Sequence, residues 1–314
     1  MDEREQLIGE KYSMLREQRQ YYDKLHYLRL LFLDPDNYYE GLKDYSTFKE
    51  PKNNSHKDAE KEVGISIFLK FKALFLDKAK CDLIHKKEKA KILEKEYEKY
   101  HYNQVKRLRE EFYDKQQQYN SDIELKKENL KNGKANEVCE YFKEALLRDK
   151  FSLDILETNE LYPINVIIDG YSNESKVLSY HYRIPDHEQI CVIGKFLFDE
   201  NEETIVSKDI DAEHARIIRL KVARALILRS AVLIFGSDNY KNIESVNITG
   251  YLEYYDTAFG NWEYIDVMKV NISRECYNKI NPERANLKDL FERKLKVKES
   301  TGLYIKRPYE LKHV

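Results

Sequence analysis

The chain has 314 residues, of which 35% are charged and 12% are aromatic, and its formal net charge is −2. This aromatic content excludes an intrinsically disordered chain, and the balanced charge excludes a globally basic nucleic-acid-binding protein. The N-terminus is too charged to begin a secretory signal peptide. The most apolar run, residues 222–235, contains two arginines and is shorter than the roughly 20 apolar residues of a membrane span. We therefore expect a cytoplasmic protein with no membrane partner.

Residues 1–84 are predicted to form an N-terminal helical region. Apolar residues recur at helical spacing across residues 6–33, and a turn signal at residues 34–37 is expected to end that helix, because proline disfavours helical geometry in the preceding residue. A polar stretch near residues 51–62 lacks apolar periodicity and predicts an exposed loop. Residues 65–76 are apolar enough to predict a buried helix. We expect these pieces to fold back along the next segment.

Residues 85–133 are predicted to form one long coiled-coil helix. Neither glycine nor proline occurs between Gly64 and Gly133, and Gly133 is expected to follow the last helical residue as the C′ position. A narrow apolar stripe on so charged a helix packs against a helix of the same chain or of a second copy. We expect a homo-oligomer whose interface contains Leu93, Tyr97, Tyr100, Val105, Leu108, Phe112, Tyr119 and Ile123.

Residues 134–296 are predicted to form an α+β module, in which a mostly antiparallel sheet packs on a long central helix. Helices are expected at residues 135–148, 209–235 and 286–295, with Gly236 as the stop of the central helix. Strands are expected at residues 164–168, 176–182, 190–193, 195–198, 245–255 and 262–272, and residues 169–173 are expected to form the first turn. Residues 297–314 form a basic tail that we expect to be loosely held.

The order of several short segments resembles a known arrangement. A charged coiled coil is followed by residues 132–138, 141–142, 162–163, 182–185, 223–235, 248–251 and 255–260. This order resembles the coiled coil and strand-rich module that precede the nuclease domain in bacterial Mrr-type restriction endonuclease proteins, and it covers residues 86–296. The resemblance implies that the chain is a non-catalytic scaffold or sensor of a DNA-restriction or anti-phage defence system, because no nuclease domain of the PD-(D/E)xK type follows the module. The implied partners are a nuclease or another defence protein, and DNA.

A degenerate or unrecognised metal-dependent nuclease is the alternative. Such a site requires two acids and a lysine close together, and the nearest candidates are Asp169, Glu174 and Lys176. They lie in or beside a predicted turn rather than along adjacent strands, so a solvated turn is the competing interpretation. A zinc site at His181, His187 and Cys191 lacks a fourth ligand. We expect no metal and no cofactor. A structural spacer without DNA contact is a third hypothesis.

Basic residues gather near the C-terminus. The predicted contacts to nucleic acid or a partner protein are Lys294, Lys296, Lys298, Lys306, Arg307 and Lys312. Because Glu299 and Glu310 are interspersed, an ordinary solvated surface is the competing interpretation. The basic residues of the central helix spread around it at 100° per residue rather than forming one stripe. These are Arg216, Arg219, Lys221, Arg224 and Arg229.

Overall fold

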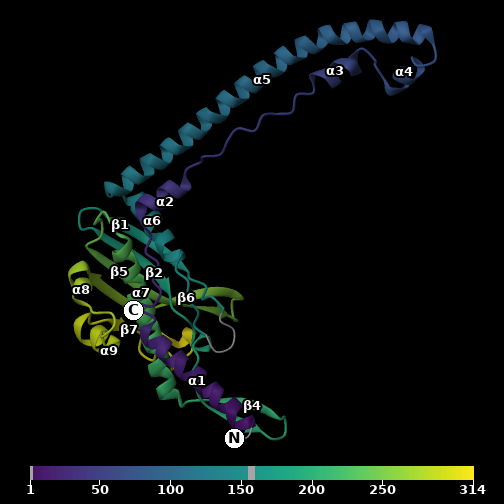
Figure 1. Ribbon diagram of the computed structural model, residues 1–314. Coiled ribbons are helices and arrows are strands. Elements are labelled where there is room, and N and C mark those ends of the chain that lie inside the picture. The colour runs from purple at the N-terminus through teal and green to yellow at the C-terminus, as the bar shows by residue number, and fades with distance from the viewer. Residues whose placement is uncertain (1–2, 155–159) are drawn as a thin grey trace. The chain divides into compact units, whose positions relative to one another are not determined.

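The computed structural model describes residues 3–154 and 160–314 and divides into two compact units. We call residues 39–125 the arm and the remaining residues the body, and we describe each by itself. The fold is α+β, as predicted (Figure 1). Within the described ranges, no helix is both long enough and apolar enough to cross a bilayer.

The arm is built on α5 (Asp77–Lys131), a single helix of 55 residues whose last turn lies in the body. It begins earlier than predicted, at Asp77. Charged side chains one turn apart support the helix, as in the pairs Lys86 with Asp82 and Arg107 with Glu111, at 3.4 and 3.5 Å. At 1.5 Å per residue, a helix of this length extends about 80 Å.

The chain before α5 folds back along the helix within the arm (Figure 1). Residues 43–54 contain no helix or strand, and we call them the cover segment. Asp44 and Asn120 exchange two hydrogen bonds, of 2.8 and 2.9 Å, and Nε2 of Gln116 donates to the carbonyl of Ser46. Folding back along the helix was predicted, but much of the covering chain is extended rather than helical.

Two short helices complete the arm, α3 (Ser55–Glu62) and α4 (Ile67–Lys72), so the predicted loop near residues 51–62 is wrong over residues 55–62. Ala59, Ile65 and Ala90 are buried together between α3 and α5. The partly buried side chains packed against them are Val63, Leu83, Leu93 and Tyr97. The prediction of a buried helix over residues 65–76 is wrong, because α4 and the turn after it expose their apolar side chains.

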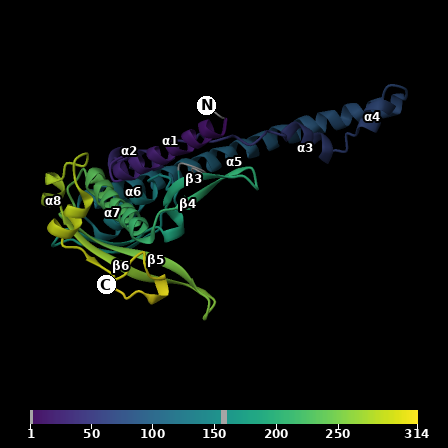
Figure 2. The same ribbon diagram turned by 90° about the horizontal axis from the view of Figure 1, so that it is seen from below.

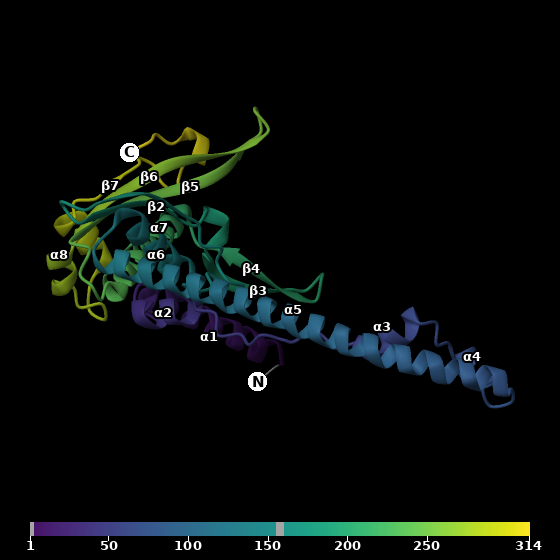
Figure 3. The ribbon, with the colours of Figure 1, turned by 90° about the horizontal axis from the view of Figure 1, so that it is seen from above.

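A five-stranded sheet forms the centre of the body, with strand order β1-β2-β5-β6-β7. Its strands are β1 (Val166–Ser172), β2 (Val177–Arg183), β5 (Ser245–Asp256), β6 (Asn261–Ser273) and β7 (Lys298–Glu299). All neighbouring pairs are antiparallel except β2 with β5. Helices α6 (Ala135–Leu147) and α7 (Ala212–Ser237) lie on one face of the sheet, and the other face points away from them (Figures 2 and 3).

A separate hairpin of β3 (Ile193–Asp199) and β4 (Thr204–Asp209) packs against α1 (Glu3–Lys24). The predicted strand pair at residues 190–193 and 195–198 is therefore wrong, because residues 195–198 lie within β3 and pair with the later strand β4. The remaining short elements are α2 (Pro35–Leu42), α8 (Arg274–Lys279), α9 (Leu287–Asp289), the π-helical turn η2 (Leu290–Lys294), and the 3-10 turns η1 (His187–Gln189) and η3 (Pro308–Glu310).

Helix α7 is the core of the body. Its second half is buried on nearly every side, as predicted. Asp211 caps its N-terminus by accepting a 3.1 Å hydrogen bond from the backbone N–H of His214. Gly236 does not stop the helix, which continues to Ser237. A side chain at Gly236 would overlap the ring of Phe32, so this glycine makes room for a close contact.

Two further predictions about the ends of the chain are wrong. The first helix ends at Lys24 rather than near residue 33. Pro35 is the first residue of α2, a position that proline tolerates because the first helical residue needs no backbone N–H. The basic tail is packed rather than loose. Leu303 and Leu311 are buried, and the hydroxyl of Tyr304 donates a 3.0 Å hydrogen bond to the carbonyl of Pro185.

Candidate functional site

The three predicted nuclease residues are not brought together. Asp169 lies within β1, at a register shift between Ile168 and Gly170, and its carboxylate contacts His181. Lys176 has a φ of +52° just before β2, and its Nζ donates a 3.2 Å hydrogen bond to the carbonyl of Lys241. Glu174 is exposed in the turn between the two strands. The predicted grouping is wrong because the turn lies later in the chain, which places Asp169 inside a strand.

His181 instead lies between two carboxylates. It alternates with the buried Tyr180 and Tyr182 along β2, so it lies on the sheet face that points away from α7. Nδ1 is 2.9 Å from Oδ1 of Asp169, and Nε2 is 3.5 Å from Oδ1 of Asp266 on β6. The second distance is too long for a good hydrogen bond, and Oδ1 of Asp266 has no other partner within the described residues. A doubly protonated imidazole has a donor for each carboxylate.

Further charged groups of both signs lie on this face. Nε of Arg183 lies 3.0 Å from the carboxylate of Glu253, which also accepts a 3.0 Å hydrogen bond from the side chain of Asn165. Two permanent cations lie on the same face, Arg183 and the exposed Lys269 of β6, which pairs in register with Thr249.

The predicted soft-metal residues also separate. His187 lies in η1, where its Nδ1 contacts Asp186, whereas His181 lies in the sheet. The backbone N–H of Cys191 donates a 3.0 Å hydrogen bond to the hydroxyl of Tyr22. Within residues 3–154 and 160–314, no group of three or more histidine, cysteine, aspartate or glutamate side chains is arranged to hold a metal ion.

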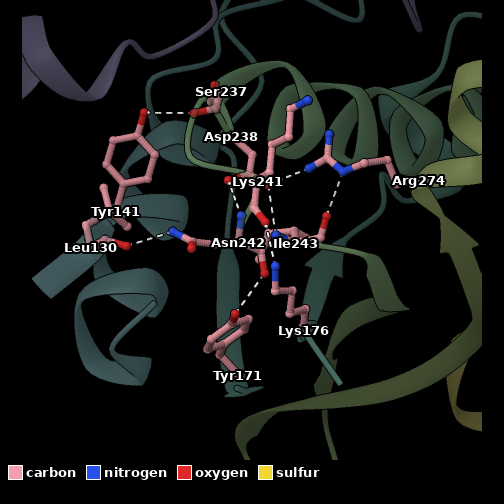
Figure 4. A network of polar contacts seen from close by, with 10 residues as sticks. All are labelled: Leu130, Tyr141, Tyr171, Lys176, Ser237, Asp238, Lys241, Asn242, Ile243 and Arg274. Atoms are coloured by element: carbon pink, nitrogen blue, oxygen red, sulfur yellow. Dashed lines mark hydrogen bonds and ion pairs between the residues drawn. The ribbon is translucent and has the colours of Figure 1, made fainter. Parts of the chain in front are cut away.

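A second polar network, at the loop between α7 and β5, surrounds the C-terminal end of α5 (Figure 4). We call it the junction. Asp238 lies at its centre with a side chain only 1% exposed, and its carboxylate accepts backbone hydrogen bonds from Asn242 and Ile243, at 2.9 and 2.8 Å. Arg274 forms an ion pair with the same carboxylate and donates through Nε to the carbonyl of Ile243. Burial raises the pKa of Asp238 despite these partners.

Asn242 connects this loop to the long helix. Its side-chain Nδ2 donates a 2.7 Å hydrogen bond to the carbonyl of Leu130, in the last turn of α5. The same carbonyl accepts a hydrogen bond from the backbone N–H of Gly133, so Asn242 adds a second bond that ties the helix end to the loop after α7. The hydroxyl of Tyr171, on β1, donates to the carbonyl of Asn242 at 2.7 Å. The end of α5, the first strand and the loop after α7 thus share one network (Figure 4).

Gly133 makes this arrangement sterically feasible. Its φ is +66°, and it follows α5 in a Schellman motif, with hydrogen bonds of 2.9 Å from Lys134 N to Asn129 O and from Gly133 N to Leu130 O. The prediction that Gly133 occupies the C′ position is confirmed. A Cβ at Gly133 would lie 3.2 Å from the side chain of Asn173 and 3.4 Å from that of Asn242.

The chain entering α2 joins the junction from the other side. The hydroxyl of Tyr141, on α6, donates to the carbonyls of Ser237 and Leu33, and the hydroxyl of Ser237 accepts a 2.9 Å hydrogen bond from the N–H of Leu33. Within the junction the polar groups bond chiefly to one another, so the arrangement is suited to holding elements in place. The sequence signal is the turn-forming run Ser237-Asp238-Asn239 after the central helix, which sequence reasoning did not use.

The predicted oligomer residues fall into two groups. Val105 and Ile123 are buried, while Leu93, Tyr97 and Phe112 are half-buried, and the Phe112 ring lies 5.8 Å from that of Phe48 in the cover segment. The three exposed members are Tyr100, Leu108 and Tyr119. The prediction of self-association therefore rests on these three residues.

The predicted contact residues near the C-terminus and the basic residues of α7 differ in exposure. Lys294, Lys296, Lys298, Lys306, Arg307 and Lys312 are all exposed. Arg224 and Arg229 of α7 are buried in ion pairs, Arg224 with Glu292 and Glu299, and Arg229 with Asp149. Sequence periodicity did not identify these two arginines as core residues.

Comparison with known proteins places the chain in no group, since no family model, curated protein or solved structure matches it. The resemblance to the module of Mrr-type proteins stays a prediction.

Proposed function

We propose that the protein is a non-catalytic scaffold that holds a long helical arm for a partner. One observation carries the proposal: Asn242, from the loop after the central helix, caps the last turn of α5 through the carbonyl of Leu130. A helix anchored by side chains of a folded body keeps its geometry at that end, which is what presenting a binding surface requires.

The support for a particular setting is the resemblance to the non-catalytic part of Mrr-type proteins. It favours a component of a bacterial DNA-restriction or anti-phage system, acting in the cytoplasm with a partner nuclease or another defence protein. The six exposed basic residues near the C-terminus are the proposed contacts to DNA or to that partner. Tyr100, Leu108 and Tyr119 are the proposed contacts between copies of the arm.

The test uses the purified full chain with labelled duplex DNA, with and without magnesium. We expect intact DNA under both conditions, and a mobility shift that weakens with salt, because contacts to phosphates release counterions. Lys306→Glu with Arg307→Glu should reduce the shift, whereas Lys95→Glu with Lys99→Glu, on the exposed surface of α5, is the matched control. Magnesium-dependent cleavage would contradict the scaffold proposal.

A metal-dependent nuclease is the second candidate, and one observation favours it. Asp169 and Asp266 lie on either side of His181, and Oδ1 of Asp266 is buried without a hydrogen-bond donor among the described residues. Carboxylates are ligands that Mg²⁺ prefers, and the His181 ring would have to move before one ion could contact both. Glu174 and Lys176 have no part in this version of the hypothesis. DNA cleavage that is lost in both Asp169→Asn and Asp266→Asn would establish it.

A further inference from the structure

The far end of the arm exposes an unusual amount of apolar surface. We call residues 66–84, which include α4 and the first turns of α5, the distal loop. Ile67 is 87% exposed and Leu74 is 74% exposed. All of its large apolar side chains that are more than half exposed, apart from Ile84, lie within ten consecutive residues: Ile67, Phe68, Phe71, Leu74, Phe75 and Leu76. Such a cluster exceeds what scattered surface residues explain, and it marks an interaction site.

The distal loop has a defined local structure. The hydroxyl of Ser66 caps α4 by accepting a 3.1 Å hydrogen bond from the N–H of Leu69. The rings of Phe71 and Phe75 lie 5.4 Å apart, and Nζ of Lys72 lies 4.6 Å from the centre of the Phe68 ring. The apolar side chains are thus displayed by an ordered turn.

A packed base holds this turn. Ile65, directly before it, is buried with Ala59 and Ala90. Nζ of Lys70 lies 2.7 Å from the carboxylate of Glu60 on α3, which pins α4 to the preceding helix. The apolar side chains therefore project from a supported element rather than from a frayed end.

The distal loop carries a net positive charge. Residues 66–84 contain four lysines and two aspartates, an excess of two positive charges, in a chain whose net charge is −2. Lys78 and Lys80 are exposed beside the apolar cluster. A second copy of the loop would bring two such positive clusters together, so charge disfavours contact between two distal loops.

We propose that the distal loop binds the surface of an anionic lipid bilayer, with its phenylalanine and leucine side chains among the acyl chains and its lysines at the headgroups. Exposed phenylalanine and leucine together with lysine are typical of segments that lie in the membrane interface. Anionic headgroups supply the charge that complements the lysines. The proposal rests on the scaffold function and names the surface that the arm attaches to.

Binding at the surface departs from our expectation of no membrane partner. That expectation was drawn from the lack of a spanning segment, and a surface contact requires none. Apolar side chains of an interfacial segment enter the bilayer by only about 5–10 Å, which a single turn of helix can supply.

The test is flotation of the full chain with vesicles of phosphatidylcholine alone and of an equimolar mixture with phosphatidylglycerol. We expect the protein to float with the anionic vesicles only. Phe71→Ser with Phe75→Ser should weaken binding on the order of a hundredfold, because two phenylalanine side chains lose their apolar environment. Lys78→Glu with Lys80→Glu should weaken it about tenfold or more, because repulsion replaces attraction.

Matched controls separate the loop from the rest of the arm. Tyr102→Ser with Tyr113→Ser removes exposed aromatic rings from the middle of α5, and Lys95→Glu with Lys99→Glu reverses charge there. Both control variants should bind vesicles like the unchanged protein. All four substituted sites are exposed, and far-ultraviolet circular dichroism verifies that the helix content is kept.

Three outcomes would overturn the proposal: no flotation with anionic vesicles, equal flotation with both vesicle types, or equal losses in the loop and control variants. If vesicles are not bound but light scattering shows a dimer that Phe71→Ser with Phe75→Ser dissociates, the occupant is a second copy. If an acidic protein is bound in its place, the occupant is that protein. Neither result affects the DNA assays, so failure of lipid binding is distinguishable from failure of the scaffold proposal.

Discussion

Arg229 and Asp149 form a buried two-bond ion pair in the body. Nε of Arg229 lies 2.6 Å from Oδ2, Nη2 lies 2.7 Å from Oδ1, and both side chains are 1% exposed. Nη1 of Arg229 also donates 2.7 Å hydrogen bonds to the carbonyls of Leu25 and Leu28, just after α1. One guanidinium on the central helix therefore joins the chain after α6 to the chain after α1.

Asp149→Ala should lower the free energy of unfolding by about 3–5 kcal/mol, because it leaves a buried guanidinium without its counter-charge. Urea unfolding measures the change. Glu144→Ala is the control, since Glu144 forms an exposed ion pair with Arg148 at 2.7 Å, and its loss should cost less than about 1 kcal/mol. Equal effects of the two substitutions would show that the buried pair has no special role.

The stability of the body should fall on acidification through His26. Its Nε2 donates a 2.7 Å hydrogen bond to the carbonyl of Pro282, and burial lowers the pKa of His26 from its ordinary value of 6.5. Because the folded state binds this proton less well than the unfolded state, the contribution of His26 to stability is complete above pH 6.5 and is lost as the pH falls through the lowered pKa.

His26→Gln keeps a donor for Pro282 and removes the titration, so its unfolding free energy should depend less on pH. Urea unfolding on either side of pH 6.5 provides the comparison. His85→Gln, at an exposed site on α5, should leave the pH dependence unchanged. An unaltered slope in His26→Gln would refute the assignment.

Gly133→Ala should destabilise the body by about 1–2 kcal/mol, because an L-residue is strained at a φ of +66° and its Cβ would press on Asn173. Thermal unfolding reports the change. Gly9→Ala is the matched control, since Gly9 lies within α1 with no atom within 4 Å of an added Cβ. That substitution should raise stability by roughly 0.5–1 kcal/mol through helix propensity. The prediction fails if both glycines respond alike.

Asn242→Ala should loosen the last turn of α5 by removing the donor to the Leu130 carbonyl. We expect about 0.5–1.5 kcal/mol less stability, because the Leu130 carbonyl loses one donor but keeps the backbone N–H of Gly133. Hydrogen exchange at residues 126–134 should accelerate, with less change in β5 and β6. Asn247→Ala, at an exposed position of β5, serves as the control. If Asn242→Ala accelerates hydrogen exchange equally throughout the body, the junction does not anchor the end of α5 locally.

Leu108→Asp should reduce the mass of any oligomer in light scattering, because it places a charge at the exposed side of the predicted stripe. Leu108 is 36% exposed and lies three turns from Tyr119, so both occupy one side of α5. Tyr102→Asp, on another side of the helix, should not alter the mass. If Leu108→Asp leaves the mass unchanged, this side of the helix is no interface between copies.

The sequence was most informative where a single helical or strand periodicity of apolar residues continues over many residues. The absence of glycine and proline predicted the long helix, and the alternating runs predicted β5 and β6 almost to their ends. It was least informative where contacts between residues far apart in the sequence determine the local structure. Nothing local in the sequence indicates that Gly236 admits the Phe32 ring, that Arg229 is buried, or that the cover segment is extended.

The candidate sites show the same division. Lys176 and Asp169 are near each other in sequence, yet one bonds to the loop after α7 and the other to a histidine on the next strand. Asp266 entered no sequence hypothesis, because it is far along the chain from both, and only strand order brings it near His181. The exposed distal loop was predicted to be buried, because an apolar composition by itself indicates a buried segment rather than a solvent-exposed one.

The cover segment gives α5 a packing partner other than a second helix. A coiled coil matches one side-chain stripe with another, whereas here Gln116 and Asn120 bind the backbone of an extended chain. The helix thus acts as a receptor for a linear peptide that belongs to the same polypeptide. Because both belong to one polypeptide, the effective concentration of this internal ligand is higher than that of a free peptide, and contacts too weak for a free peptide suffice to keep it bound.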